Sequence, residues 1–183
     1  MRIVAGERRG MQLVAPRGDA VRPTSDRVRQ ALFSMLGDIS GAIVLDAFAG
    51  TGALALEALS RGAAHAHLCE RSPVALTALR RNVDRLGYGS RVTVERIDAV
   101  RRISRDQRRG ARYDLILLDP PYRILAALQQ PLAQHLAAIL EPDGVVALEG
   151  PSGSPLLELP LRVERARIHG GTRIALLRHP AAT

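Results

Sequence analysis

The chain has 183 residues but no lysine, no tryptophan, one cysteine, two phenylalanines and three tyrosines. With so few rings, we expect no RNA surface made of several stacked aromatic side chains, and the core must consist mainly of Leu, Val, Ile and Ala. The lone Cys69 excludes an internal disulfide and favours a reducing compartment. Because it lies in a largely apolar run, we expect a buried thiol rather than a nucleophile.

Metal ligands and membrane segments are also scarce. His65 and His67 would share one face of a strand, but no further His or Cys accompanies them, and we expect no metal site. No apolar run approaches a membrane span, and the N-terminus lacks an apolar signal segment, so we expect a cytoplasmic protein without a membrane partner. The length and the 46% hydrophobic content predict a single domain over residues 1–183, which we expect to be a monomer.

The positive charge is large and comes entirely from arginine. The 26 basic residues outnumber the 18 acidic ones, which gives a formal net charge of +8 and a pI near 11.1. Such a field attracts polyanions, and the planar guanidinium can hold a phosphate with two hydrogen bonds or stack on a base. A compositional bias of the genome would also replace lysine by arginine, so the charge favours nucleic-acid binding without establishing it.

One compact cluster, Asp119-Pro120-Pro121-Tyr122, directly follows the apolar residues 115–118. A base or amide nitrogen is a poor nucleophile because its lone pair is delocalised, so a methyl-transfer catalyst must hold its N–H groups with acceptors. Asp119 and the Pro120 carbonyl can accept these hydrogen bonds. The prolines stiffen the turn, and Tyr122 offers a face on which a ring can stack. The alternative is a simple strand end, which proline often marks.

A second candidate site lies where the apolar residues 43–45 run into a glycine turn and then a helical pattern. Glycines let the backbone approach a ligand, and the helix directs free N–H groups into the turn. The turn consists of Asp46, Ala47, Phe48, Ala49, Gly50, Thr51 and Gly52.

A nicotinamide cofactor is the rival ligand for this turn. Gly50, Gly52 and Ala55 fit the G-x-G-x-x-A dinucleotide pattern, and Glu70 follows about twenty residues later, placed to accept hydrogen bonds from ribose hydroxyls. Asp46, however, would repel a pyrophosphate and suit the ammonium group of a methionine-bearing cofactor. A dehydrogenase would also have no catalytic role for the cluster that begins at Asp119.

The wider pattern alternates strands and helices. We expect strands near residues 43–46, 66–70, 92–97, 113–119 and 145–149. Helices should begin at Thr24 or Ser25 and at Ser72, the latter ending at Gly87, and a further helix should cover residues 125–140 with an interruption at Pro131. Residues 2–5 and 11–14 predict a basic β-hairpin within an N-terminal extension, residues 1–22. The pattern indicates an α/β fold with a mostly parallel, doubly wound sheet.

Four acids follow predicted strands, namely Asp46, Glu70, Asp98 and Asp119. The carboxyl ends of parallel strands meet at one edge of a sheet, which is where such folds bind ligands. Any one acid could end a strand because it prefers water. Four together favour a site.

These motifs, in this order, look like those of a Rossmann-like class I S-adenosylmethionine-dependent amino-methyltransferase. More narrowly, the chain resembles the bacterial RsmD family of 16S rRNA guanine-N2 methyltransferases. The resemblance rests on residues 2–6 with Arg9-Gly10, on residues 22–33 and on residues 45–63. It extends to about Glu149 and ends with a weaker Gly170-Gly171-Thr172, and no functional residue is carried over from the proline-rich segment after Glu149.

The resemblance implies a class I methyltransferase fold with an antiparallel C-terminal hairpin, S-adenosylmethionine as cofactor and S-adenosylhomocysteine as product. It implies methylation of the N2 amine of a 16S rRNA guanine, of the guanine(966) type, in the small ribosomal subunit or an assembly intermediate. Asp46 and the backbone of Ala47, Phe48, Ala49, Gly50, Thr51 and Gly52 would bind the methionine part, Glu70 the ribose, and Asp98 with Ala99 the adenine, flanked by Arg71 and Val100. The target amine would meet Asp119, Pro120, Pro121 and Tyr122.

The N-terminal extension would position the RNA, with contacts from Arg8, Arg9, Arg22, Thr24 and Arg27. The alternative is an arm that only covers a sheet edge. Three other functions stay open besides the dehydrogenase: methylation of adenine in DNA, methylation of a protein glutamine, and a non-catalytic RNA-binding module. The intact Asp46, Gly50, Gly52 and Asp119 argue against the last.

Overall fold

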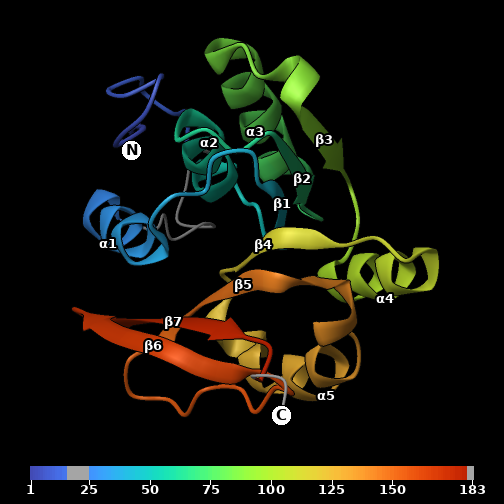
Figure 1. The fold of residues 1–183 in the computed structure, drawn as a ribbon. Helices are drawn as coiled ribbons and strands as arrows, with labels where there is room; N and C mark the ends of the chain where they lie inside the picture. Colours follow the sequence, from blue (N-terminus) through green and yellow to red (C-terminus); the bar gives the residue numbers. More distant parts are fainter. Residues whose placement is uncertain (16–24, 181–183) are drawn as a thin grey trace.

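A seven-stranded sheet forms the centre of the computed structural model, which describes residues 1–15 and 25–180 (Figure 1). The strand order is β3-β2-β1-β4-β5-β7-β6. Strands β1 to β5 pair in parallel, whereas β7 is antiparallel to both β5 and β6. The bounds are β1 Ile43–Asp46, β2 His65–Cys69, β3 Val92–Glu95, β4 Tyr113–Leu118, β5 Leu140–Pro151, β6 Arg162–His169 and β7 Thr172–Arg178.

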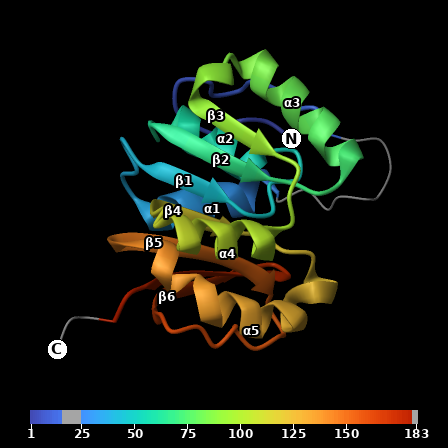
Figure 2. The ribbon, with the colours of Figure 1, turned by 90° about the vertical axis from the view of Figure 1, so that its right-hand side faces the viewer.

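Five α-helices cover the two faces of this sheet. They are α1 Asp26–Leu36, α2 Ala53–Ser60, α3 Pro73–Leu86, α4 Ala99–Arg109 and α5 Leu125–His135, with short 3₁₀ turns at Gly89–Arg91, Tyr122–Ile124 and Ala137–Ile139. Helices α1, α2 and α3 pack on one face, and α4 and α5 pack on the other, where Figure 2 shows them in front of the strands. This arrangement confirms the expected Rossmann-like α/β fold with its antiparallel C-terminal hairpin.

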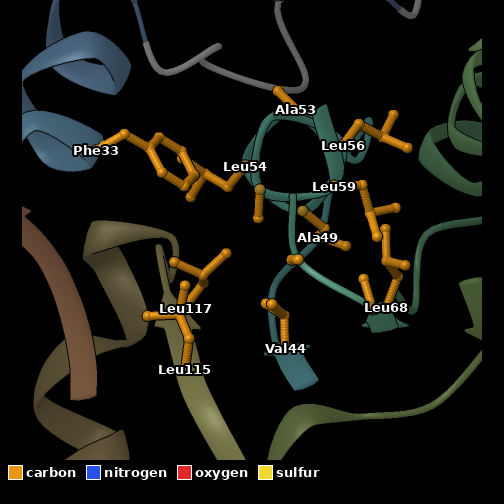
Figure 3. Packing of buried hydrophobic residues seen from close by; sticks show 14 of the residues in the cluster. Phe33, Val44, Ala49, Ala53, Leu54, Leu56, Leu59, Leu68, Leu115 and Leu117 are labelled. Atoms are coloured by element: carbon orange, nitrogen blue, oxygen red, sulfur yellow. The ribbon is translucent and has the colours of Figure 1, made fainter. Parts of the chain in front are cut away.

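The strands alternate between two apolar cores because both faces of the sheet are covered. In β4, Leu115 and Leu117 face the first core, whereas Ile116 and Leu118 face the second. Figure 3 shows Val44 of β1 and the same two leucines of β4 below α2, with Phe33 of α1 directed toward Leu54. All eight residues of α2 are buried, which fixes this helix and the turn before it against the sheet.

Several helix ends follow the sequence expectations. Ser25 caps α1 and accepts the Val28 N–H, and Ser72 caps α3 and accepts the Ala75 N–H. Gly87 ends α3 in the left-handed conformation. The alternative cap, Thr24, lies outside the described residues. No helix within residues 1–15 and 25–180 is long and apolar enough to cross a membrane. Cys69 is buried as expected, and burial raises the pKa of its thiol to about 12.

Two element bounds were predicted wrongly. Helix α5 ends at His135 and contains Pro131 in its interior, and β5 begins at Leu140, five residues before the expected strand. At this junction Leu136, Ile139 and Leu140 are fully buried in the second core. The helix predicted over residues 125–140 is therefore too long, because the last residue of this apolar run belongs to β5 in the sheet.

The N-terminal segment, residues 1–15, doubles back as expected, but it forms a single bridge between Arg2 and Gln12 rather than two strands. The Ile3 and Leu13 N–H groups bond across the hairpin, to Met11 O and Met1 O, but other N–H groups of the segment bond to α2 instead. Glu57 accepts the N–H groups of Val4 at 2.7 Å and Ala5 at 3.0 Å.

The acceptor Glu57 is itself fully buried and pairs with two arginines. Arg61 Nε lies 2.8 Å from one carboxylate oxygen, and Arg29 Nε lies 3.5 Å from the other. The Ser60 hydroxyl accepts the Arg8 N–H at 3.0 Å and donates to the Ala5 carbonyl at 2.6 Å. The N-terminal segment is thus held by polar groups of α2.

We predict that Gly6→Ala releases this segment, whereas Gly10→Ala does not. Both glycines have positive φ, 81° and 84°, so alanine strains each by about 1 kcal/mol. A methyl group on Gly6 would also lie 1.7 Å from the Ser60 carbonyl oxygen, whereas one on Gly10 meets open space. Urea unfolding should show a loss of about 3 kcal/mol or more for Gly6→Ala only. Equal losses would contradict the close packing of Gly6 on α2.

Candidate active site

A cavity of about 780 Å³ opens at the carboxyl ends of β1, β2, β4 and β5. Its size is typical of sites for small organic ligands. The start of α1 and the turn between β6 and β7 complete its wall. The predicted residues that line it are Asp46, Ala47, Phe48, Ala49, Gly50, Thr51, Glu70, Arg71, Asp98, Ala99, Asp119, Pro120, Pro121, Tyr122 and Arg27. The sheet therefore brings the two predicted motifs, separated by about seventy residues, into one cavity.

The glycine turn is held by backbone hydrogen bonds to neighbouring strands. Ala47 N–H donates to Leu117 O at 3.2 Å, and Ala49 N–H donates to Cys69 O at 2.9 Å. Gly52 does not line the cavity. It stands behind the turn as the N-cap of α2, in the left-handed conformation and without a side-chain cap, so the backbone at the start of α2 is directed toward the turn.

Asp46 ends β1 and is buried, with 1% of its surface exposed. Neither carboxylate oxygen has a hydrogen-bond partner of normal geometry within the described residues. Desolvation, followed by the negative charge of Asp119, raises the pKa of Asp46 to about 7, although the Phe48 and Ala55 N–H groups offset part of this shift. An unpartnered buried carboxyl is costly, so a cationic ligand group beside it would stabilise the ionised form.

Glu70 and Asp98 follow β2 and β3 and are both fixed by backbone donors. Glu70 accepts the Gly50 N–H at 2.9 Å and the Ser72 N–H at 2.7 Å, which ties the glycine turn to the end of β2. Asp98 caps α4 by accepting the Val100 N–H at 3.0 Å and the Arg101 N–H at 3.3 Å. Each carboxylate keeps further lone pairs for a ligand hydroxyl or amine.

The cluster that begins at Asp119 follows β4. Asp119 is half-buried, Pro120 is buried, and Pro121 leads into the 3₁₀ turn of Tyr122–Ile124. The Tyr122 hydroxyl lies 3.3 Å from the Thr172 hydroxyl of β7. This contact holds the ring at the cavity wall, where it could stack on a planar ligand.

Sequence reasoning missed Glu149 as a site residue. It follows β5 residue Leu148, which pairs with Leu118, so Glu149 stands beside Asp119 at the same sheet edge. Its side chain is buried, lines the cavity, and has one oxygen without a hydrogen-bond partner among the described residues. Burial, the charge of Asp119 and the charge of Asp46 raise its pKa to about 9. The signal was available, since Glu149 ends a predicted strand as the other four acids do.

The β6–β7 turn was also missed as part of the site. His169, Gly170, Gly171 and Thr172 line the cavity although they come from the antiparallel part of the sheet. The weak Gly170-Gly171-Thr172 match was the only sequence signal for them.

The predicted RNA contacts separate into three groups. Arg27 lines the cavity, whereas Arg22 and Thr24 lie outside the described residues. Arg9 is exposed on the N-terminal segment. Arg8 is half-buried, since its Nε donates to Leu86 O at 2.9 Å and its guanidinium lies 5.6 Å from the Tyr88 ring centroid. Arg8 thus helps to anchor the segment, and its RNA contact stays a prediction.

No group of three or more His, Cys, Asp or Glu residues suited to a metal ion occurs in residues 1–15 and 25–180. The strand order, the glycine turn and the acids at the strand ends define a class I methyltransferase fold with a cavity at the expected sheet edge.

Comparisons with known proteins agree with this class. A family model described as "Conserved hypothetical protein 95" matches residues 1–178. The chain is 36% identical over 155 residues to the putative rRNA methyltransferase YlbH of Bacillus subtilis, covering 81% of this chain and 82% of that protein. It is 37% identical over 150 residues to ribosomal RNA small subunit methyltransferase D of Escherichia coli, covering 81% and 71%.

A solved structure, the putative methyltransferase yhhF from Escherichia coli, superimposes with a TM-score of 0.81 at 31% identity and covers 98% of both chains. The chain therefore belongs to the Conserved hypothetical protein 95 family, which is the RsmD family.

We predict that Asp46→Asn stabilises the ligand-free protein at neutral pH. The raised pKa means that wild-type Asp46 stabilises the fold fully below its unfolded value of 3.8, and that this stability is lost as the pH rises toward 7. Thermal unfolding at about pH 5 and about pH 8 should show the wild type falling behind Asp46→Asn by about 5 °C or more. A constant difference between the two would contradict the buried, uncompensated acid.

Proposed function

We propose that the protein transfers the methyl group of S-adenosylmethionine to the exocyclic N2 amine of a guanine in 16S rRNA. The observation that carries the proposal is the meeting of Asp46, the glycine turn and the Asp119-Pro120-Pro121-Tyr122 cluster in one cavity. Family membership and the named rRNA methyltransferases among the relatives support it. The guanine N2 atom and the nucleotide position rest on resemblance.

The residues fit a sulfonium cofactor. Asp46 is buried without a hydrogen-bond partner of normal geometry among the described residues, which suits a cationic ligand and disfavours a pyrophosphate. A methyl group on Gly52 would lie 3.1 Å from Leu56, so the packing behind the turn leaves little room for a side chain at this position. We assign Asp46 and residues 47–52 to the methionine part, Glu70 to the ribose, and Asp98 with Ala99 to the adenine.

The bound cofactor would supply an activated methyl group, and the chain would supply orientation and charge placement. Asp119 and the Pro120 carbonyl would hold the N–H groups of the target amine, while Tyr122 stacks on the base. The amine lone pair would form the new N–C bond while the C–S bond of the methyl donor breaks, with its electron pair staying on sulfur. The amine proton would pass to the Asp119 carboxylate, which releases it to water when the product leaves. A covalent enzyme intermediate is unnecessary, and buried Cys69 is unsuited to forming one.

The experiment that tests the function is methyl transfer from labelled S-adenosylmethionine to small ribosomal subunits lacking the modification, followed by nucleoside analysis. Label in N2-methylguanosine is expected. Label in a different nucleoside would keep the mechanism and discard guanine N2. If no RNA is labelled, the DNA, protein-glutamine and non-catalytic alternatives must be tested with the same cofactor.

Asp119→Ala should separate cofactor binding from catalysis. We expect methyl transfer to fall by about two orders of magnitude or more, because an acceptor of the amine hydrogen bonds is lost. The affinity for S-adenosylhomocysteine, measured by calorimetry, should change little. A comparable loss of cofactor affinity would contradict the division of roles between Asp46 and Asp119.

Arg9→Ala should flatten the salt dependence of RNA binding. Each phosphate contact contributes roughly 0.7 to 0.9 to the slope of log affinity against log salt. Arg9 is exposed on the N-terminal segment, whereas the control Arg108→Ala changes an arginine bonded to Ser104 on α4. A reduced slope for Arg9→Ala alone supports an RNA-positioning segment. Equal slopes for the two variants and the wild type would favour an arm that only covers the fold.

A further inference from the structure

Glu149 is the buried acid of the cavity to which the mechanism above gives no role. It lies in β5, two residues before the end of the strand, and next to Asp119, which follows β4, because Leu148 and Leu118 are paired in register. Adjacent strands lie about 4.8 Å apart, so the two carboxyl groups leave the sheet side by side. Asp46 follows β1 on the other side of β4.

The surroundings of Glu149 favour its neutral form. Its side chain is 3% exposed, and no described N–H or O–H group donates to Oε1. The charged groups that influence it are Asp119, Asp46 and the buried Arg29 of α1, and only Arg29 favours ionisation. Other titratable groups on the cavity wall are Arg27, Glu70, Arg71, Asp98, Tyr122, Arg123 and His169.

A neutral carboxyl group carries an O–H donor, and a buried donor needs an acceptor. The neighbouring carboxylate of Asp119 is such an acceptor, and two adjacent carboxyl groups commonly share one proton because they cannot both ionise at low cost. We propose that Glu149 is a positioning residue of the amine site, which donates its proton to Asp119 so that the pair presents one negative charge and one oriented oxygen to the target amine.

This inference rests on the proposed function and deepens it. The pair enters the reaction with one proton and a charge of −1. When the amine nitrogen forms its bond to the methyl group, its departing proton passes to the Asp119 oxygen that faces the amine, and the pair becomes neutral. Release of that proton to water restores the starting state. Without Glu149, Asp119 would keep its charge but lose the donor that fixes its orientation.

Three variants separate this role from a structural one. Glu149→Gln keeps an N–H donor toward Asp119 but has no carboxyl proton to titrate, and Glu149→Ala removes the donor. The control Glu158→Gln removes an exposed acid outside the cavity. We expect Glu149→Gln to retain at least about a third of the wild-type kcat, and Glu149→Ala to lose about tenfold or more. The KM for RNA and the affinity for S-adenosylhomocysteine should stay within about threefold, and Glu158→Gln should match the wild type.

A second measurement needs no substrate. The infrared spectrum of the cofactor-free wild type at about pH 8, above the pKa of Asp46 and below that of Glu149, should contain the C=O band of a protonated carboxyl group that is much weaker in Glu149→Gln and unchanged in Glu158→Gln. This band should disappear as the pH rises through about 9, since the folded protein then releases the proton. A carboxylate band in its place would overturn the inference even if every variant were active.

The kinetic results can also overturn it. Equal loss in Glu149→Gln and Glu149→Ala would show that the negative charge of Glu149 is needed, and full activity of Glu149→Ala would show that no donor is needed. If the wild type methylates no RNA, the proposed function fails. The infrared band then still decides whether Glu149 holds a proton beside Asp119.

Discussion

Uncompensated negative charge at one edge of the sheet is the constraint on which this site depends. Asp46, Asp119 and Glu149 lie at or near the carboxyl ends of three neighbouring strands, β1, β4 and β5. Burial and mutual repulsion raise the pKa of Asp46 and of Glu149, so the protein groups around the cavity favour the neutral forms of both acids. A cation bound beside Asp46 and a shared proton at Glu149 are the two ways in which the site can relieve this cost. In the proposed function, the acids that weaken the ligand-free protein are also the groups that favour a cationic ligand.

The scaffold around the cavity is rigid where the chemistry requires a fixed geometry. Helix α2 is wholly buried, and its Glu57 and Ser60 hold the N-terminal segment. Asn82 of α3 accepts the Val14 N–H at 2.7 Å and donates to Thr51 O of the glycine turn at 3.0 Å. One buried amide thus links the N-terminal segment to the proposed cofactor turn. We interpret this link as the reason why an exposed basic segment can have a fixed position relative to the cavity.

The sequence was most informative where a site residue directly follows an apolar strand. Asp46, Glu70, Asp98 and Asp119 were predictable because each lies beside a local pattern, and parallel strands bring such positions together. The β6–β7 turn could not be placed in this way, because it reaches the cavity only through the antiparallel insertion of β7 between β5 and β6. The intramolecular role of Arg8 depends on Leu86 and Tyr88, which are remote in sequence, and no local pattern indicates such a contact.

The central claim is that a cationic cofactor compensates the buried Asp46. Calorimetric titration of S-adenosylmethionine into the protein at about pH 6.5, repeated in buffers of different ionisation enthalpy, measures the protons exchanged on binding. We predict proton release by the wild type, because binding lowers the raised pKa of Asp46, and no such release by Asp46→Asn. Binding without proton exchange, or the same release in both proteins, would contradict the account.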